Sequence, residues 1–304
     1  MSEPTCARRR HVQKGDNRAV HRVTAALCVV SFALVYAQER PLPDVDVFMA
    51  QVRARLATDE MRQSGYMYRE RRTEEKLDAM GRTVHSSEKV FEVYPGLPGE
   101  TRYRRLIEED GRPIPSGTLS SEDRKRQRLA QDYVNRLATT AGRAEDAQRR
   151  DQERRDEAAA IDDIFRVYDI RLVGREWVEG GETIVATLTP RIGVTARTDD
   201  GKMMRHFTAR AWISEAEYEV VRVEIDALDD LSIGWGLLAR VHKGAHATYE
   251  RRKINDEIWL PAEVTWSGAG RLLLVKRVRE RGRSEFFGYR KFTVGTSTTY
   301  TAAP

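Results

Sequence analysis

The sequence predicts an α+β protein with one large curved antiparallel sheet, a half-open barrel of about eleven strands, together with a short N-terminal helix and a long charged central helix. Two observations lead to this fold class. Apolar and polar residues alternate with period two in many short runs, which is typical of strands with one buried face. Only residues 44–60 and 119–165 show helical periodicity instead. A sheet of this many strands curls, and helices on its concave side would cover both apolar stripes.

Residues 1–37 have the features of a signal peptide. Six of the 52 basic residues but only two of the 47 acidic residues lie here, so this segment carries most of the net charge of +5. The uncharged run Val23–Val35 is shorter than the roughly 20 apolar residues that a membrane-spanning helix needs. Val35-Tyr36-Ala37 resembles a cleavage motif that ends at Ala37. We therefore predict an exported, periplasmic protein without an integral membrane span after cleavage; a leader retained as an anchor is the alternative.

Both cysteines, Cys6 and Cys28, lie in this leader. Leu27 stands where a lipoprotein signal has a small residue, so we do not expect Cys28 to be lipidated. A chain cleaved after Ala37 would contain no disulfide, no thiolate metal ligand and no cysteine nucleophile. Its stability would have to come from its own hydrophobic core. Residues 38–295 are long enough to form one such domain, and residues 296–304 are predicted to be a flexible tail.

The N-terminal part of the domain is expected to be a helix followed by three strands. Apolar residues recur every three or four positions over residues 44–60, and Asp44 has a side chain suited to an N-cap. From Gly65 onward the period changes to two. Further extended runs follow at residues 88–94 and 102–108.

The central segment differs in composition from the rest of the domain. Ten Lys/Arg and nine Asp/Glu occupy the 36 positions from Glu122 to Glu157, with a thin apolar stripe at i, i+4 spacing. Ser120-x-x-Asp123 resembles a capping box, which would place the start of the helix near residue 119. The helix predicted at 119–165 has two interpretations. It is either a solvated helix with many salt bridges or an arm that binds a partner.

The C-terminal half is predicted to be almost entirely strands separated by turns. Turns are expected at Gly180-Gly181, Asp199-Asp200-Gly201, Asn255-Asp256, Gly268–Gly270 and Gly282 because Gly, Asn and Asp favour the backbone angles that turns require. The predicted strands are 167–173, 183–189, 206–213, 219–225, 239–249, 258–266, 272–278 and 284–292.

This arrangement of a leader, a lone helix, Tyr-x-Tyr strands, a charged helix and a meander resembles the LolA/LolB-like fold, which includes periplasmic lipoprotein carriers. A group of uncharacterised exported bacterial proteins is more similar still. The resemblance implies the fold and does not by itself imply an activity. The similarity to the LolA/LolB-like fold rests on the order of elements and on the late strands. The similarity to the uncharacterised exported group rests on Leu77–Gly81, Tyr94-Pro95, Tyr103–Ile107, Asp110–Pro113, Leu172–Gly174, Trp212–Tyr218, His242–Gly244, Asn255–Pro261 and Tyr289–Phe292.

The sequence contains no recognisable catalytic constellation. It has no nucleophile-elbow, Walker or dinucleotide-binding pattern, so we predict a protein that is not an enzyme and has no cofactor. His242 and His246 would share one face of a strand at 239–249, but zinc needs a third ligand, and we predict no metal site. Acidic neighbours compensate most arginine clusters, and export removes the usual partner, so nucleic acid is not expected either.

The remaining candidate for function is the concave apolar face of the sheet. A curved sheet covered by one or two helices leaves room for a cavity, and apolar side chains there would suit an acyl chain. We predict that the protein holds a lipid, acyl chain or lipoprotein; the alternative is an envelope interaction protein with a dry core and a partner bound by residues 119–165. The same lining side chains could instead be core beneath the helices. Alternation selects Tyr66, Tyr68, Phe207, Ile213, Val221, Val223, Leu260, Val264 and Trp266.

Overall fold

The computed structural model describes residues 40–97, 102–233, 239–272 and 276–291. Residues Leu42–Pro304 form one compact unit, distinct from Met1–Pro41. The predicted signal peptide, residues 1–37, and the predicted tail, residues 296–304, lie outside the described residues. Within the described residues, no helix is both long and apolar enough to cross a membrane.

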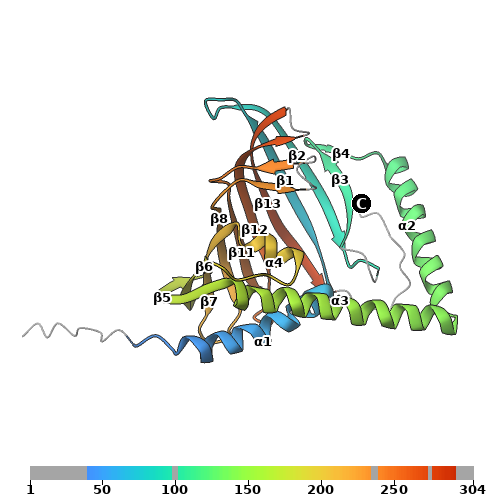
Figure 1. Cartoon of the computed structure of the whole chain (residues 1–304). Coiled ribbons are helices and arrows are strands. Elements are labelled where there is room, and N and C mark those ends of the chain that lie inside the picture. The colour runs from blue at the N-terminus through green and yellow to red at the C-terminus, as the bar shows by residue number, and fades with distance from the viewer. Residues whose placement is uncertain (1–39, 98–101, 234–238, 273–275, 292–304) are drawn as a thin grey trace, which may run out of the picture. The chain divides into compact units, whose positions relative to one another are not determined.

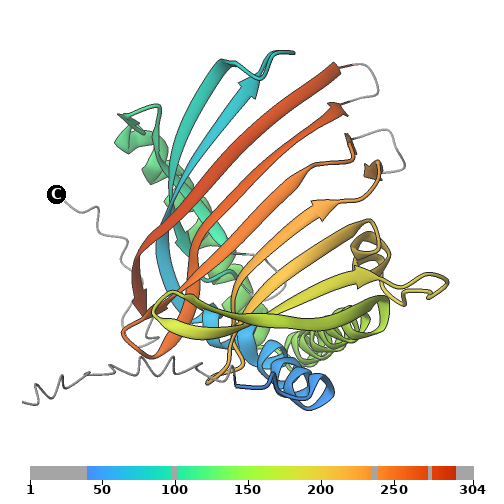
Figure 2. The same ribbon diagram turned by 90° about the vertical axis from the view of Figure 1, so that its left-hand side faces the viewer.

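All strands of the described residues belong to one antiparallel sheet, which is strongly curved and does not close (Figures 1 and 2). Eleven strands follow one another in the order β4-β3-β2-β1-β13-β12-β11-β8-β7-β6-β5, and β9 and β10 attach beside β12. The predicted α+β class is confirmed. The strands are β1 (Tyr66–Leu77), β2 (Thr83–Tyr94), β3 (Tyr103–Glu109), β4 (Arg112–Pro113), β5 (Tyr168–Val178), β6 (Gly181–Pro190), β7 (Phe207–Ser214), β8 (Val220–Ala227), β9 (Leu231–Ile233), β10 (Ala239–Val241), β11 (His246–Ile254), β12 (Ile258–Leu272) and β13 (Lys276–Lys291).

The last strands correct two of the predicted turns. The turns expected at Gly268–Gly270 and Gly282 are wrong, because β12 and β13 run straight through these glycines. In an extended strand a glycine allows another side chain to approach the backbone closely without reversing the chain, as Ala245 does at Gly268 and Trp266 does at Gly282. The strand predicted at 239–249 is also wrong, since β10 ends at Val241 and β11 begins at His246. Gly244, with a φ of +83°, makes the turn between them.

Two of the predicted hairpin turns are present, one of them shifted. Asn255 and Asp256 have φ values of +51° and +55°, and positive φ at both central residues is the mark of a type I′ turn. The turn between β5 and β6 has positive φ at Glu179 and Gly180, one residue earlier than predicted.

The helices begin near the predicted positions but divide differently. Helix α1 (Val45–Ser64) is capped by Asp44, whose Oδ1 accepts the Val47 backbone N–H at 3.0 Å. The single helix predicted at 119–165 is wrong, because α2 (Ser116–Leu137) and α3 (Thr140–Val167) are separate. Thr139 interrupts them and caps α3 by accepting the Gly142 N–H.

The predicted capping box is also wrong. Helix α2 begins one turn earlier, after Pro115, so Ser120 and Asp123 lie inside it. Asp123 instead accepts hydrogen bonds from Arg105 of β3, at 2.8 and 2.9 Å, and Arg126 lies 4.7 Å over the ring of Tyr103. These contacts hold α2 beside the edge of the sheet.

A fourth helix, α4 (Asp199–Met204), replaces the turn predicted at Asp199-Asp200-Gly201. Asp163 of α3 is fully buried next to it and accepts the backbone N–H groups of Arg197 and Thr198 and the Thr198 hydroxyl. Burial by itself would raise the pKa of Asp163, but these hydrogen bonds outweigh burial and hold the pKa below its usual value.

The main core lies between α1 and one side of the sheet, which we call the inner face; the opposite side is the outer face. Phe48, Met49 and Val52 of α1 pack on Ile184 and Ala186 of β6 and on Ala211 and Ile213 of β7. Residues paired across a ladder lie on the same face. The pairs Ala186–Ala211, Ala211–Val223, Val223–Tyr249, Tyr249–Val264 and Val264–Ser284 therefore extend the inner face across six strands.

Buried charges also attach α1 to the sheet. The Arg251 side chain of β11, 2% exposed, donates to Asp59 of α1 at 2.8 Å and to Glu219 at 3.4 Å. Arg62 of α1 pairs with the same Glu219. Because each charge faces an opposite charge across the helix–sheet boundary, removal of one partner would leave another buried and unpaired.

Candidate ligand-binding pocket

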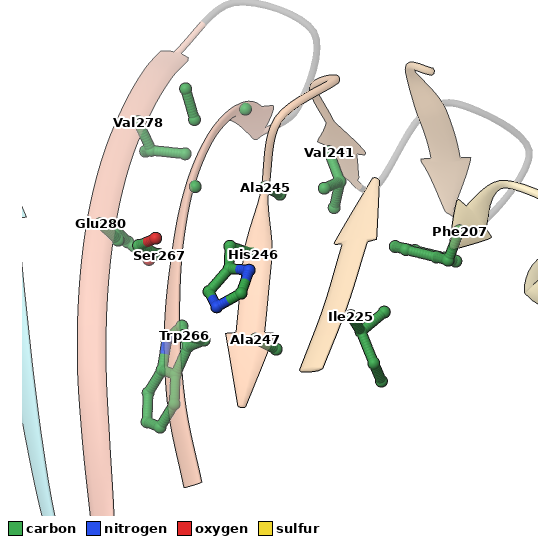
Figure 3. A pocket seen from close by; sticks show the side chains of 13 residues that line it. Phe207, Ile225, Val241, Ala245, His246, Ala247, Trp266, Ser267, Val278 and Glu280 are labelled. Carbon is green, nitrogen blue, oxygen red and sulfur yellow. The ribbon is translucent and has the colours of Figure 1, made fainter. Parts of the chain in front are cut away.

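A pocket of about 370 Å³ opens on the inner face, where β7, β8 and β10–β13 present side chains beyond the reach of α1 (Figure 3). Its volume lies within the range of about 300–1,000 Å³ that is usual for small-molecule sites. Most of its lining is aliphatic or aromatic, and Glu280 is the acidic residue in its wall. The main apolar side chains are Phe207, Ile225, Val241, Ala247, Trp266 and Val278.

The pocket exists because small residues stand where the pattern of the sheet would place large ones. Successive strand residues point to opposite faces, so Gly268 and Gly270 follow Trp266 along the inner face of β12. Ala245, just before β11, lies close to Gly268. A Cβ added at Gly268 would lie only 3.0 Å from the Cβ of Ala245. Gly268 therefore lets Ala245 pack close against β12, and these small residues form part of the pocket wall.

Trp266 forms the boundary between this apolar pocket and a polar region. A Cβ at Gly282 of β13 would lie 2.1 Å from Cζ2 of Trp266, so the indole ring lies directly over this glycine. Gly282 pairs with Glu74 of β1, and Arg72 of the same strand pairs with Ser284. The guanidinium of Arg72 lies 5.7 Å from the centroid of the Trp266 ring. The glycine thus allows the tryptophan to reach toward β1.

The polar region is a cluster around Glu70, a carboxylate that is only 4% exposed. Arg104 of β3 contacts it at 2.6 Å, Arg72 Nε donates to it at 3.2 Å and Ser284 Oγ donates to it at 2.8 Å. Arg104 also lies 4.2 Å over the ring of Phe91. We call Arg72 and Arg104 the arginine pair; their side chains are 34% and 33% exposed.

Between the pocket and α1 the inner face is aromatic. The rings of Tyr68 and Tyr289 lie 5.1 Å apart, and Tyr68 also contacts Phe286 edge-on at 5.7 Å. Burial raises the pKa of Tyr249 to about 12 and likewise raises the pKa of Tyr289. These phenols are therefore neutral at physiological pH.

The structure brings two of the nine predicted residues, Phe207 and Trp266, into the pocket. Ile213 is 1% exposed in the core beneath α1, and Val223 packs against that same cluster. For these last two, the observed surroundings are those of core residues.

The other five predicted residues lie outside the pocket. Tyr66 and Leu260 form a second core cluster with Ile258. Tyr68 belongs to the aromatic surface, Val264 pairs with Tyr249 and Ser284 on the inner face, and Val221 is 1% exposed. Whether any of the nine contacts a ligand stays a prediction.

Sequence reasoning missed most of the pocket. Ile225, Ala247 and Val278 were assigned to strands, yet nothing in the local pattern separates them from core residues. The glycines at 268 and 270 did carry a signal, because they keep the inward positions of the alternation set by Val264 and Trp266. Because these glycines were interpreted as a turn, their inward positions in β12 were not recognised.

The two histidines of the metal hypothesis have separate partners. His242 lies in the turn before β11, and its Nδ1 is 3.0 Å from Asp230. His246 lies at the start of β11, and its Nδ1 is 2.8 Å from Asp226 of β8. The expectation that both share one strand face is wrong, because the strand is broken between them. In the part of the chain that the structure describes, no group of three or more His, Cys, Asp or Glu could hold a metal ion.

Neither a protein-family model nor a curated protein sequence matches this chain. Several solved structures are similar to it. A putative outer membrane lipoprotein-sorting protein domain from Vibrio parahaemolyticus has 10% identity and a TM-score of 0.32 over 84% of this chain and 96% of that chain. A DUF1329 family protein from Desulfovibrio piger has 13% identity and a TM-score of 0.30 over 85% of this chain and 97% of that chain. A LolA superfamily protein from Nitrosomonas europaea has 8% identity and a TM-score of 0.27 over 79% of this chain and 92% of that chain.

Lipoprotein-sorting and LolA-superfamily proteins are thus among the solved structures that resemble this chain, in agreement with the resemblance noted in the sequence. At TM-scores of this size the likeness carries no argument about a ligand or partner. The argument for function therefore has to come from the pocket itself.

Proposed function

We propose that this chain is an exported, periplasmic and non-catalytic binding protein that holds a lipid or acyl chain, free or attached to a lipoprotein, on the inner face of its sheet. The observation that carries the proposal is the apolar pocket of about 370 Å³ beside Trp266. The signal-peptide features of residues 1–37 support export.

The chemistry of the pocket favours a flexible hydrocarbon over a polar ligand. Burial of apolar surface contributes about 25 cal/mol per Å², which a chain gains by contact with Ile225, Ala247 and Val278. A polar ligand of the same size would lose its hydrogen bonds to water and find few partners among these side chains. Trp266–Gly270 of β12 form one wall of the pocket, and a chain lying against this wall would run along the strand.

Binding of a neutral apolar probe tests this proposal. We expect the full chain to bind N-phenyl-1-naphthylamine at one site, with a rise in fluorescence, and dodecanol to displace it. Ala247→Leu fills the pocket and should weaken probe binding at least tenfold. Thr248→Leu is the matched control, because its pairing with Glu224 and Thr265 places it on the outer face of the same strand. Absence of probe binding, or equal weakening by both variants, would contradict the proposal.

A second candidate function is the binding of a protein partner through residues 119–165. The observation that favours it is the exposure of two large apolar side chains on α2, Leu129 at 52% and Val134 at 57%. Several ion pairs of α3, such as Asp146–Arg150 and Arg149–Glu153, join residues on the same helix and fit a solvated surface equally well. Crosslinking from Leu129→Cys and Val134→Cys in cells would test it, and crosslinks to no envelope protein would argue against it.

A further inference from the structure

We propose that the arginine pair, Arg72 and Arg104, recognises an anionic head group, so that the preferred ligand is a single-chain amphiphile with a carboxylate. This inference rests on the proposed function and adds the ligand class. The apolar pocket would take the chain, and the arginine pair would take the head across Trp266.

The first argument is continuity along the inner face. Trp266 lines the pocket, and its ring is 5.7 Å from the Arg72 guanidinium. Arg72 pairs with Ser284 across β1 and β13, and Ser284 pairs with Val264 of β12, which lies two residues from Trp266 on the same face. A chain lying along the pocket therefore meets Arg72 where the apolar lining ends.

The second argument is the balance of charge around Glu70. Two guanidinium groups and the Ser284 hydroxyl all point to one buried carboxylate, which satisfies its oxygens. Each arginine has five N–H donors in a fixed fork, more than its share of Glu70 can use. Arg72 also lies 3.7 Å from Glu74, but that carboxylate is 54% exposed and its attraction is weakened by water.

The third argument is accessibility combined with fixed geometry. About a third of each side chain in the arginine pair remains exposed, while Glu70 and the rings of Trp266 and Phe91 hold the guanidinium planes in place. Arginine presents parallel donors to a carboxylate, and a fork that is already positioned loses little entropy when it binds.

The test compares ligands that share one tail. Dodecanoate, dodecanol and dodecyltrimethylammonium would each displace the neutral probe from the full chain, below their micelle concentrations and at about pH 8, where the carboxylate is ionised. We expect dodecanoate to bind roughly tenfold more tightly than dodecanol, as a charge-assisted hydrogen bond would allow. Arg72→Gln and Arg104→Gln should each remove most of this preference while dodecanol affinity stays within about twofold.

A matched control is available on the outer face. Arg210 lies 4.9 Å over the ring of Trp212, an arrangement like that of Arg72 over Trp266, so Arg210→Gln should leave the preference unchanged. Arg72→Lys, which keeps the charge, should retain part of it. Equal binding of dodecanoate and dodecanol, or tighter binding of the cationic ligand through Glu280, would overturn this inference and leave the pocket intact. Failure of all three ligands to bind would instead overturn the proposed function.

Discussion

Two regions of the inner face are built from the same alternating strands, yet they differ in what covers them. In the covered region, Ile184, Ala186 and Ile213 meet Phe48 and Val52 of α1 and are almost completely buried. In the open region, Phe207, Ile225 and Trp266 have the same inward orientation but stay partly exposed around the pocket. Alternation therefore determines which face a side chain occupies, whereas burial depends on what a distant helix supplies.

The largest expected effect follows from this difference in covering. Phe48→Ala would leave a cavity between α1 and the sheet and should lower the free energy of unfolding by about 3–5 kcal/mol. Ile225→Ala removes a side chain that already faces open space, so we expect a loss below about 1.5 kcal/mol. Urea denaturation measures both. Equal losses would mean that the open region is as well packed as the covered one.

A smaller effect is expected at the junction of α3 and α4, with a characteristic pH dependence. Asp163→Asn replaces a carboxylate that accepts hydrogen bonds from Arg197 and Thr198, and should cost about 1–3 kcal/mol at neutral pH. The pKa of Asp163 is lower in the folded chain than in the unfolded chain, so the unfolded chain binds the proton more readily. Its contribution is thus complete above the unfolded pKa and declines as the pH falls through the folded pKa.

Urea denaturation at several pH values would follow this contribution. The difference in unfolding free energy between the original chain and Asp163→Asn should shrink as the pH falls below about 4. A difference that stays constant over that range would show that the charge of Asp163 is not what stabilises the junction.

The sequence was sufficient for most of the sheet. Strand alternation and the Asp44 cap are local properties, and the turn at Asn255-Asp256 follows from residues that tolerate positive φ. The break between α2 and α3 was missed because the apolar stripe continues across Thr139, although the uncharged residues 137–142 and the N-capping side chain of Thr139 mark it. The start of α2 was misplaced since Asp123 serves a tertiary contact with Arg105, a pairing that sequence spacing does not reveal.

The pocket was less predictable than the fold, for a physical reason. Its lining comes from six strands that the ladder brings together, and the selection of Phe207 and Trp266 rested only on alternation. Gly282 shows the difficulty most clearly. A glycine in a sequence is compatible with a turn or with close approach of another group, and only the position of the Trp266 ring decides between them.

Gly282 also provides the next prediction in size. Gly282→Ala would place a methyl group where the Trp266 ring now lies, and the ring would have to move. We expect a loss of about 1–3 kcal/mol from overpacking, together with weaker binding of the neutral probe because the wall of the pocket shifts. Gly174→Ala is the control, since a Cβ there meets nothing within 4 Å. Equal thermal stability of the two variants would indicate that Trp266 moves without cost.

The smallest effect on stability is expected where a side chain serves the pocket more than the core. Val278→Ala removes two methyl groups from the pocket wall, and because Val278 is only partly buried the loss of stability should stay below about 1 kcal/mol. The same change should weaken binding of the neutral probe severalfold. Val185 on the outer face is the opposite case, because it pairs with Trp212 and is 1% exposed. Val185→Ala should therefore lower the stability more than Val278→Ala does and leave probe binding unchanged. If instead the two variants changed stability and binding in the same proportion, the open region would be an extension of the core, and the pocket beside Trp266 would have no separate role.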